Sequence, residues 1–233
     1  MLTIVLPTGR VLKDTLSLME KTGIPVKKIN ERGRKLIVKE GDFRFIFAKP
    51  MDVPLHISHG TADIGFVGSD VMKELDVPLV ELVDTGRGKC RMVVAGPPEL
   101  EPRFCGHESG LMWLTVATKY PNIADRHFSS LGVQVQILNL HGSIELAPEI
   151  GLSDCILDIV QTGRTLKANN LKILDNVIPV SLYLAANKKS SQFKWQEISN
   201  IVHRIKEIKE GEDFEQGLRE EDFRNNDYLQ MDR

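Results

Sequence analysis

The sequence predicts an α/β fold of two lobes, because short apolar strand segments alternate with amphipathic helix segments along the chain. The chain has 233 residues, of which 42% are hydrophobic, and this composition is enough to bury a core. The alternation occurs twice, before and after a Gly-Pro-Pro turn at residues 96–98. Two such lobes joined by two chain crossings would leave a cleft between them, which is the usual place for a ligand.

The first lobe is expected to alternate strands and helices from its start. Gly41 supplies the backbone freedom for a hairpin turn between two apolar runs, which should pair antiparallel. Gly68-Ser69-Asp70 is a good helix cap, with Asp70 satisfying N–H groups. The expected strands are at residues 2–6, 35–38, 43–48, 63–67, 78–82 and 90–95, and the expected helices are at residues 11–21, 54–60 and 71–75.

The second lobe repeats the pattern before the chain crosses back. Apolar residues at helical spacing in 195–208 predict a closing helix that packs against the first lobe. The expected strands are at residues 114–117 and 133–138, from Cys155 and after Leu171, and the expected helices are at 124–131 and from Ser143. The expected division is lobe I at 1–92 plus 186–209, lobe II at 93–185, and a polar, flexible tail at 210–233.

Composition and charge exclude several classes of function. The formal net charge is -2, so no basic field marks a nucleic-acid binder. Cys90, Cys105 and Cys155 are odd in number and lack a zinc-binding arrangement, which favours reduced thiols. The N-terminus has no basic leader or cleavage site, and no segment is apolar enough to cross a bilayer. We therefore expect a cytoplasmic protein with no membrane contact.

The most informative stretch runs from Asp158 to Leu166, where an apolar strand opens into a small polar loop and then a helix. Gly163 allows a tight turn. Thr162, Arg164 and Thr165 could direct N–H groups, two hydroxyls and a guanidinium into one concavity at a helix N-terminus, which suits a phosphate dianion. The alternative is an ordinary capped helix, since Thr-Gly-x-Thr is a short motif.

Two acids flank the same strand. Asp158 stands at its end and Asp154 at its start, where carboxylates gain little from a buried setting and should face a ligand. A diphosphorylated ribose offers hydroxyls and a bound magnesium ion to carboxylates, and an oxocarbenium-like transition state would gain from negative charge. Asp158 and Asp154 are therefore the predicted catalytic residues, although Asp154 could equally be an acid of a surface turn.

Further candidates lie outside the loop. Arg91 interrupts an apolar strand, where an arginine is costly without a partner, so it is a candidate cleft cation. Glu145 and Glu149 share one face of a predicted helix, a spacing that is also common among exposed glutamates. His141 has no nucleophile to serve and is not expected to act as a general base.

At these residues the chain resembles the ATP phosphoribosyltransferase family of histidine biosynthesis. Similar segments occur throughout residues 1 to 209. The family signature is matched at Glu145, Glu149, Gly151, Ser153, Ile156, Asp158, Thr162-Gly163 and Thr165-Leu166, and further similar segments are residues 6–10, 52–54, 62–70, 90–91 and 117–121.

The resemblance implies that N1 of ATP attacks C1 of 5-phosphoribosyl 1-pyrophosphate, releasing pyrophosphate with the help of Mg²⁺. It also implies a two-lobed fold similar to type II periplasmic binding proteins, with both substrates in the interlobe cleft. Under this interpretation Thr162, Gly163, Arg164 and Thr165 bind the 5-phosphate. Binding of ATP and pyrophosphate would fall to a second group: Arg10, Lys49, Arg91 and Glu145. The magnesium ion would be held mainly by substrate phosphates.

Length points to the short form of this family, because only a closing helix and a polar tail follow the second lobe. Short forms work with a regulatory subunit resembling a histidyl-tRNA synthetase, which implies a hetero-oligomer here. The chain departs from the family at two places. Thr8 stands where a lysine is usual, and Lys49 stands where arginine is frequent, so bidentate phosphate binding is lost there.

Two other functions remain open from the residues alone. A two-lobed α/β fold also suits a non-catalytic sensor that binds a small anion or nucleotide, because fold does not decide function. A phosphoribosyltransferase with another base acceptor would share the phosphate loop. Only the similar segments outside the loop point to ATP.

Overall fold

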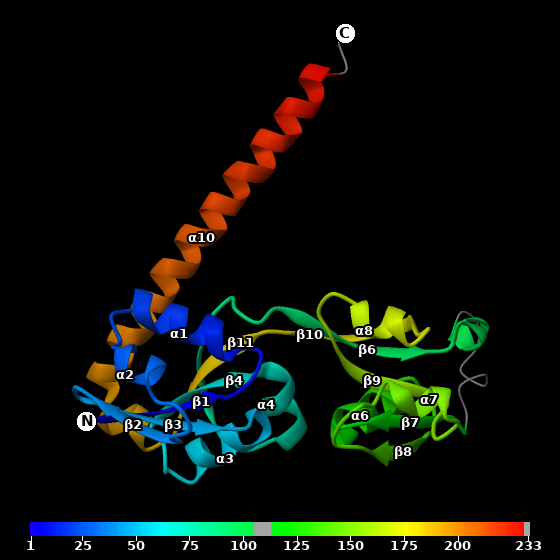
Figure 1. Cartoon of the computed structure of the whole chain (residues 1–233), viewed down its shortest axis with the longest axis horizontal. Helices are drawn as coiled ribbons and strands as arrows, with labels where there is room; N and C mark the ends of the chain where they lie inside the picture. Colours follow the sequence, from blue (N-terminus) through cyan, green and yellow to red (C-terminus); the bar gives the residue numbers. More distant parts are fainter. Residues whose placement is uncertain (105–112, 231–233) are drawn as a thin grey trace. The chain divides into compact units, whose positions relative to one another are not determined.

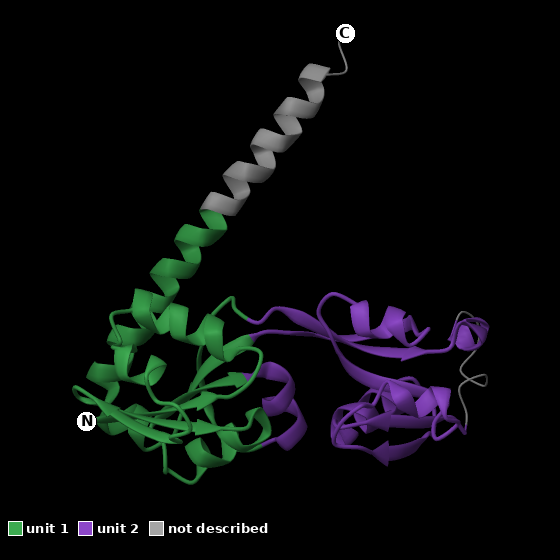
Figure 2. Cartoon of the chain, in the orientation of Figure 1, with its two compact units in different colours: residues 1–67, 77–87, 182–233 green, residues 68–76, 88–181 purple. Residues whose placement is uncertain are grey.

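The computed structural model describes residues 1–104 and 113–230, with side chains as far as residue 214. The chain forms two compact units, and the predicted α/β class is confirmed because each unit is built on one sheet (Figure 2). Unit 1 comprises Met1–Val67, Val77–Arg87 and Leu182–Arg233, and unit 2 comprises Gly68–Asp76 and Gly88–Ser181. Cys105 lies outside the described residues.

The chain passes between the units four times, whereas the sequence led us to expect two passages, near residues 92 and 185. The passages lie after Val67, Asp76, Arg87 and Ser181. The whole of strand β6 (Cys90–Gly96) pairs within the sheet of unit 2, and the whole of β11 (Leu182–Ala186) pairs within that of unit 1. The two additional passages arise because helix α4 (Ser69–Leu75) packs on helix α6 (Pro121–Ser130) of unit 2.

Unit 1 contains a six-stranded sheet in the order β2-β3-β1-β4-β11-β5. β1 is parallel to β3 and β4, the predicted β2–β3 hairpin is antiparallel, and β11 enters antiparallel to β5. The strands are β1 (Leu2–Pro7), β2 (Ile37–Glu40), β3 (Phe43–Ala48), β4 (Ile64–Gly68), β5 (Val80–Asp84) and β11.

Helices cover both faces of this sheet (Figure 1). On one face, α1, α2 and the start of α10 bury apolar side chains against the strands, with Leu18, Ile29 and Ile198 in one continuous core. α3 packs on the other face, against β1 and β11. The helices are α1 (Leu12–Lys21), α2 (Lys27–Asn30), η1 (Pro50–Asp52), α3 (Val53–Ser58), α9 (Ser190–Phe193) and α10 (Trp195–Gln230).

The last helix is longer than expected. We predicted a helix to residue 208 followed by a flexible tail, whereas α10 continues to Gln230. The segment is rich in Glu, which is a good helix former. Ion pairs also join the start of the extension to the rest of unit 1, because Lys209 bonds Asp84 and Glu212 accepts from both Lys21 and Arg87.

Unit 2 contains a five-stranded sheet in the order β10-β6-β9-β7-β8. β7 is parallel to both β8 and β9, so these three strands end at the same edge. The strands are β6, β7 (Thr115–Thr118), β8 (Gln136–Asn139), β9 (Cys155–Val160) and β10 (Lys172–Val180), and the helices are α4, η2 (Pro98–Leu100), α5 (Glu101–Phe104), α6, α7 (Leu146–Glu149) and α8 (Arg164–Ala168).

Open α/β sheets bind ligands beyond the carboxyl ends of their parallel strands. In unit 2 we therefore expect ligand-binding residues in the segments that follow β7, β8 and β9. Within the described part of the chain, no helix has both the length and the hydropathy needed to cross a membrane.

Candidate functional site

The predicted phosphate loop lies at the carboxyl edge of unit 2 and joins β9 to α8. Gly163 has a φ of 71°, in the left-handed region, and its carbonyl accepts the first helical bond of α8 from Lys167 N at 3.0 Å. A Cβ at this position would meet Val160 Cγ1 at 4.0 Å. Glycine is therefore required here by the backbone angle and not by lack of space.

The loop presents several donors to solvent. The Thr162, Arg164 and Thr165 side chains are exposed, and no side chain caps α8 among the described residues. The amides of the first turn of a helix have no partner inside the helix. The loop therefore exposes N–H groups, hydroxyls and a guanidinium at the start of α8, and their joint binding of one anion stays a prediction from the sequence.

Asp158, near the end of β9, is a largely buried carboxylate, with 16% of its side chain exposed. Its Oδ1 makes no hydrogen bond to any described residue and lies 3.6 Å from Lys119 Nζ, an ion-pair distance. Burial raises the pKa of the Asp158 carboxyl, the positive charge of Lys119 opposes this rise, and Glu145 adds to it. A buried acceptor without a hydrogen bond is rare and points to a missing partner such as a ligand.

The predicted residue Glu145 is thus close enough to Asp158 to influence its pKa. It comes directly before α7, in the segment that follows β8. Lys119, by contrast, was not singled out from the sequence. The available signal was its position directly after an apolar strand, where a parallel sheet places ligand-facing residues.

Tyr120 and Asp70 lie beside this group. The Tyr120 hydroxyl donates a hydrogen bond of 2.8 Å to Asp70 Oδ2, and both residues are buried. Burial raises the pKa of Tyr120 far above its ordinary value, and the negative charge of Asp70 adds to the rise. We expected Asp70 to cap its own helix, but no side chain caps α4, and Asp70 bonds Tyr120 instead.

Arg91 lies next to the start of the loop. It pairs in register with Val160 on the neighbouring strand β9, and its side chain is exposed. Its Nη1 donates a 3.1 Å hydrogen bond to Asn176 Oδ1. The strand that carries Arg91 therefore places this cation near the loop without burying it.

Asp154 stands at the opposite end of β9. Its Oδ2 accepts a hydrogen bond of 2.7 Å from Thr115 N, and its own N–H donates to Thr115 O at 2.9 Å. A strand rises about 3.3 Å per residue, so Asp154 and Asp158 are separated by about 13 Å along β9. The structure does not bring Asp154 to the loop, and its carboxylate holds the start of β7.

Arg10 and Lys49 belong to unit 1, unlike the other predicted site residues. Arg10 follows β1 and Lys49 follows β3, which are parallel neighbours. Thr8 ties the two strand ends together, because its N and Oγ1 both donate to Ala48 O, at 2.8 and 3.1 Å. The two cations therefore share the carboxyl edge of the sheet in unit 1.

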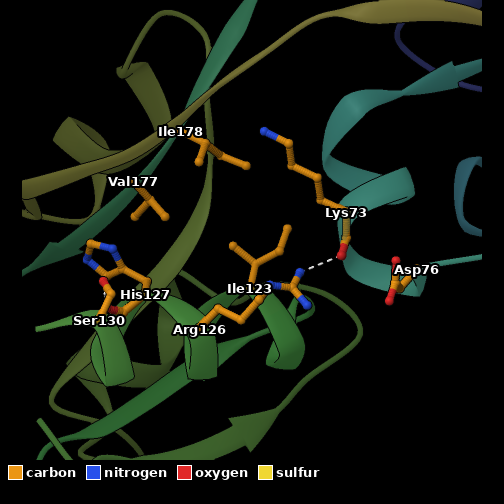
Figure 3. A pocket seen from close by; sticks show the side chains of 8 residues that line it. All are labelled: Lys73, Asp76, Ile123, Arg126, His127, Ser130, Val177 and Ile178. Carbon is orange, nitrogen blue, oxygen red and sulfur yellow. Dashed lines mark hydrogen bonds between the residues drawn. The ribbon is translucent and has the colours of Figure 1, made fainter. Parts of the chain in front are cut away.

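A separate cavity of about 470 Å³ opens between α4, α6 and β10 within unit 2 (Figure 3). Lys73, Arg126 and Asp76 give it mixed charge, and none of its lining residues comes from the predicted phosphate loop. Among the described residues, no group of three or more His, Cys, Asp or Glu side chains is arranged to hold a metal ion.

Comparisons with known proteins agree in sequence and in structure. A family model described as HisG: ATP phosphoribosyltransferase matches residues 49–207. ATP phosphoribosyltransferase from Aquifex aeolicus is 44% identical over 205 residues, covering 88% of this chain and 94% of that protein. A chain in the ATP phosphoribosyl transferase (HisG:HisZ) complex from Thermotoga maritima matches with a TM-score of 0.77 and 34% identity, covering 91% of this chain and 100% of that chain.

A more distant likeness concerns the fold alone. The substrate binding protein of an amino acid ABC transporter matches with a TM-score of 0.54 and 15% identity, over 92% of this chain and 96% of that chain. This likeness confirms the class of fold expected from the sequence, the type found in periplasmic binding proteins.

Proposed function

Because this chain belongs to the ATP phosphoribosyltransferase family, we propose that its loop from Asp158 to Leu166 binds the 5-phosphate of phosphoribosyl pyrophosphate, with Asp158 as the catalytic carboxylate. The chain is a transferase of histidine biosynthesis. In its reaction, N1 of ATP attacks C1 of 5-phosphoribosyl 1-pyrophosphate and gives 1-(5-phosphoribosyl)-ATP and pyrophosphate. Membership of the family decides against a non-catalytic sensor and against another base acceptor.

The observation that carries the site proposal is the buried Oδ1 of Asp158 at the edge where the loop begins, which accepts no hydrogen bond from a described residue and lies 3.6 Å from the Lys119 ammonium. As C1 loses pyrophosphate, positive charge develops on the ribosyl ring, and a fixed carboxylate in a partly water-excluded position stabilises that charge. Burial raises the pKa of Asp158, and the positive charge of Lys119 opposes this rise and so favours the ionised carboxylate. No side chain needs to act as a nucleophile, so the protein contributes positioning and electrostatics.

The 5-phosphate would be held by donors from Thr162 to Thr165. Charge-assisted hydrogen bonds of this type are about twice as strong as neutral ones, so local donors replace the missing global positive charge. Arg91 and Glu145 of unit 2, and Arg10 and Lys49 of unit 1, are proposed to contact ATP and pyrophosphate. Asp154 is a weaker candidate, because its carboxylate bonds the backbone of Thr115.

Magnesium is the proposed cofactor. Mg²⁺ is commonly held by one or two carboxylates together with substrate phosphates, while it retains several waters. The protein fits a mode in which the substrate phosphates supply most of the ligands, because among the described residues no group of three or more His, Cys, Asp or Glu side chains is arranged to hold a metal ion. The ion would neutralise charge on the pyrophosphate leaving group.

A regulatory subunit resembling a histidyl-tRNA synthetase is the proposed protein partner. The solved relative from Thermotoga maritima is a HisG:HisZ complex, and the match covers the whole of that chain. Pyrophosphate release should therefore rise when such a subunit is added to the purified chain. Equal activity with and without it would contradict the partner proposal.

The catalytic role of Asp158 is tested by an Asp158→Ala variant. Turnover should fall by about 100- to 1,000-fold, the usual cost of removing one stabilising group from a transition state. Unfolding temperature serves as the control for folding. Near-normal pyrophosphate release from ATP and phosphoribosyl pyrophosphate would refute the proposal.

The phosphate loop has a separate test in Thr165→Val, which removes a hydroxyl donor at nearly constant volume. Affinity for phosphoribosyl pyrophosphate should weaken by about tenfold or more, because a hydrogen bond to a charged group contributes about 1.5–3 kcal/mol. Isothermal titration measures this directly, with Thr165→Ser as the matched control that retains the donor. Unchanged affinity in Thr165→Val would exclude a role of this hydroxyl.

A further inference from the structure

Helix α4 is bonded to the rest of unit 2 through Glu74, a carboxylate that is 3% exposed. Its Oε1 accepts a hydrogen bond from Asn122 N, and its Oε2 accepts one from Ile123 N, each at 3.0 Å. These amides belong to the first turn of α6, where the residue at the N-cap, Tyr120, makes no side-chain cap. Glu74 thus caps α6 from another helix and places negative charge at its positive end.

Asp70, one helical turn earlier, holds the same turn through Tyr120. A Cβ at position 68 would lie 2.2 Å from Asp70 Oδ1, so glycine at this position leaves room for the carboxylate. Asn122 adds a third bond, because its Nδ2 donates to the backbone carbonyl of Glu74 at 2.9 Å. The two acids therefore bind residues 120, 122 and 123, directly after Lys119.

The same turn is also tied to β9 on its other side. Thr118 Oγ1 donates to Leu157 O at 2.7 Å and accepts from Tyr120 N at 2.9 Å. Leu157 precedes Asp158 in the chain. Lys119 thus lies between two fixed points, one on α4 and one on the strand that carries the catalytic carboxylate.

We propose that Glu74, assisted by Asp70, is a positioning residue of the reaction, which fixes the turn that places Lys119 beside Asp158. This inference rests on the proposed catalytic role of Asp158. Glu74 acts through the backbone of α6 and does not touch the substrate. Its contribution is to keep Lys119 Nζ within ion-pair distance of a carboxylate that must remain ionised.

The charges around Asp158 give this arrangement a measurable consequence. Lys119, after β7, is the cation that lowers the pKa of Asp158, while Glu145, ahead of α7, raises it. Burial raises the pKa of Tyr120, at the start of α6, and the charge of Asp158 adds to this rise. Arg91 of β6 pairs with Val160, two residues along β9. When the turn shifts and Lys119 moves away, the effects of burial and Glu145 lose this opposition, so the pKa of Asp158 rises further and the carboxylate binds a proton at higher pH.

The principal test is Glu74→Gln, which keeps the size of the side chain but sets an NH₂ group against one of the two backbone N–H groups. The matched control is Arg126→Gln. Arg126 also joins α6 to α4, through the backbone carbonyl of Lys73, but it lies beyond the first turn of α6 (Figure 3). Removing this bond leaves the turn after Lys119 in place.

We expect kcat of Glu74→Gln to fall by up to about 100-fold, the loss that a displacement of about 1 Å can cause. The acid limb of the pH profile should move upward by about one unit, because an opposite charge within 4–6 Å shifts a carboxylate pKa by about 1–3 units. KM for phosphoribosyl pyrophosphate should change little, since Glu74 does not touch the loop. Arg126→Gln should keep the wild-type acid limb.

A double variant separates positioning from a general structural effect. In a Lys119→Met background, Glu74→Gln should not move the acid limb further, because its action passes through Lys119. A further upward shift in that background would overturn the inference, as would a wild-type profile in a folded Glu74→Gln protein. Gly68→Ala, which displaces the Asp70 carboxylate, should also move the acid limb of the pH profile upward. An unchanged acid limb in this variant would count against the inference.

Asp158→Asn is assayed alongside these variants, with thermal unfolding measured for each. If Asp158→Asn retains full turnover, the proposed function of Asp158 fails. If Asp158→Asn is inactive while Glu74→Gln behaves as the wild type, only the positioning role fails.

Discussion

Substitution of Gly163 by alanine tests whether the phosphate loop binds through its backbone. Gly163 has a φ of 71°, and the nearest atom to an added Cβ is 4.0 Å away, so the methyl group meets no obstacle. The change therefore acts on the backbone conformation alone. Because the loop is exposed, the alanine can relax to a negative φ in the free enzyme and must return to the left-handed region to present its amides.

The size of the loss in affinity is set by the cost of returning the substituted alanine to the left-handed conformation. The left-handed conformation costs an L-residue other than glycine about 1–2 kcal/mol. Since 1.4 kcal/mol corresponds to a factor of ten in affinity, phosphoribosyl pyrophosphate should bind about 5- to 30-fold more weakly to Gly163→Ala. Isothermal titration at fixed magnesium and ionic strength measures this difference.

Gly151 supplies a matched control within the same unit. Its φ is 72°, an added Cβ would meet nothing within 4 Å, and it lies in the turn after α7, ahead of β9. Gly151→Ala therefore introduces the same backbone strain away from the loop, and it should leave the affinity unchanged. Equal affinities of Gly163→Ala and the wild type, or an equal loss in both variants, would refute the role of the Gly163 backbone.

Two further predictions concern residues outside the loop. Asp154→Ala should lower the free energy of unfolding by about 0.5–1.5 kcal/mol, because Thr115 N loses an exposed hydrogen bond, while turnover of the folded enzyme stays near normal. A large loss of kcat would restore Asp154 as a catalytic residue. Burial lowers the pKa of His127 below 6.5 despite the opposing charge of Asp175. The unfolded chain therefore binds a proton first on acidification, so the free energy of unfolding should fall from about pH 6.5 until the folded-state pKa is passed. His127→Gln should flatten this dependence in urea titrations, and identical profiles in both proteins would contradict it.

Local sequence patterns were sufficient for much of the fold. Apolar runs bounded by Gly, Pro and Asp located the strands to within a few residues, since burial and turn chemistry both act locally. Pairing was harder to predict. Strand β11 lies between β4 and β5, which precede it in the chain by roughly a hundred residues, and no local signal reports such a partner.

The candidate site shows the same division between local and distant information. The tight turn at Gly163 follows from residues adjacent in sequence, and in the structure Gly163 has the left-handed conformation directly before α8. Lys119 and Glu74 could not be found in this way. Lys119 reaches Asp158 only because β7 and β9 are parallel neighbours, and Glu74 meets α6 because α4 leaves the unit of its flanking strands.

The insertion of β11 into the sheet of unit 1 also fixes an order of events during synthesis on the ribosome. β1, β3 and β4 emerge early, but the strand that joins β4 to β5 is made only after all of unit 2. Unit 2 can therefore complete its sheet while the nascent first unit still exposes the unpaired edge of β4. An open edge is a template for unwanted pairing, so the nascent chain is most exposed to aggregation shortly before residue 186 leaves the exit tunnel.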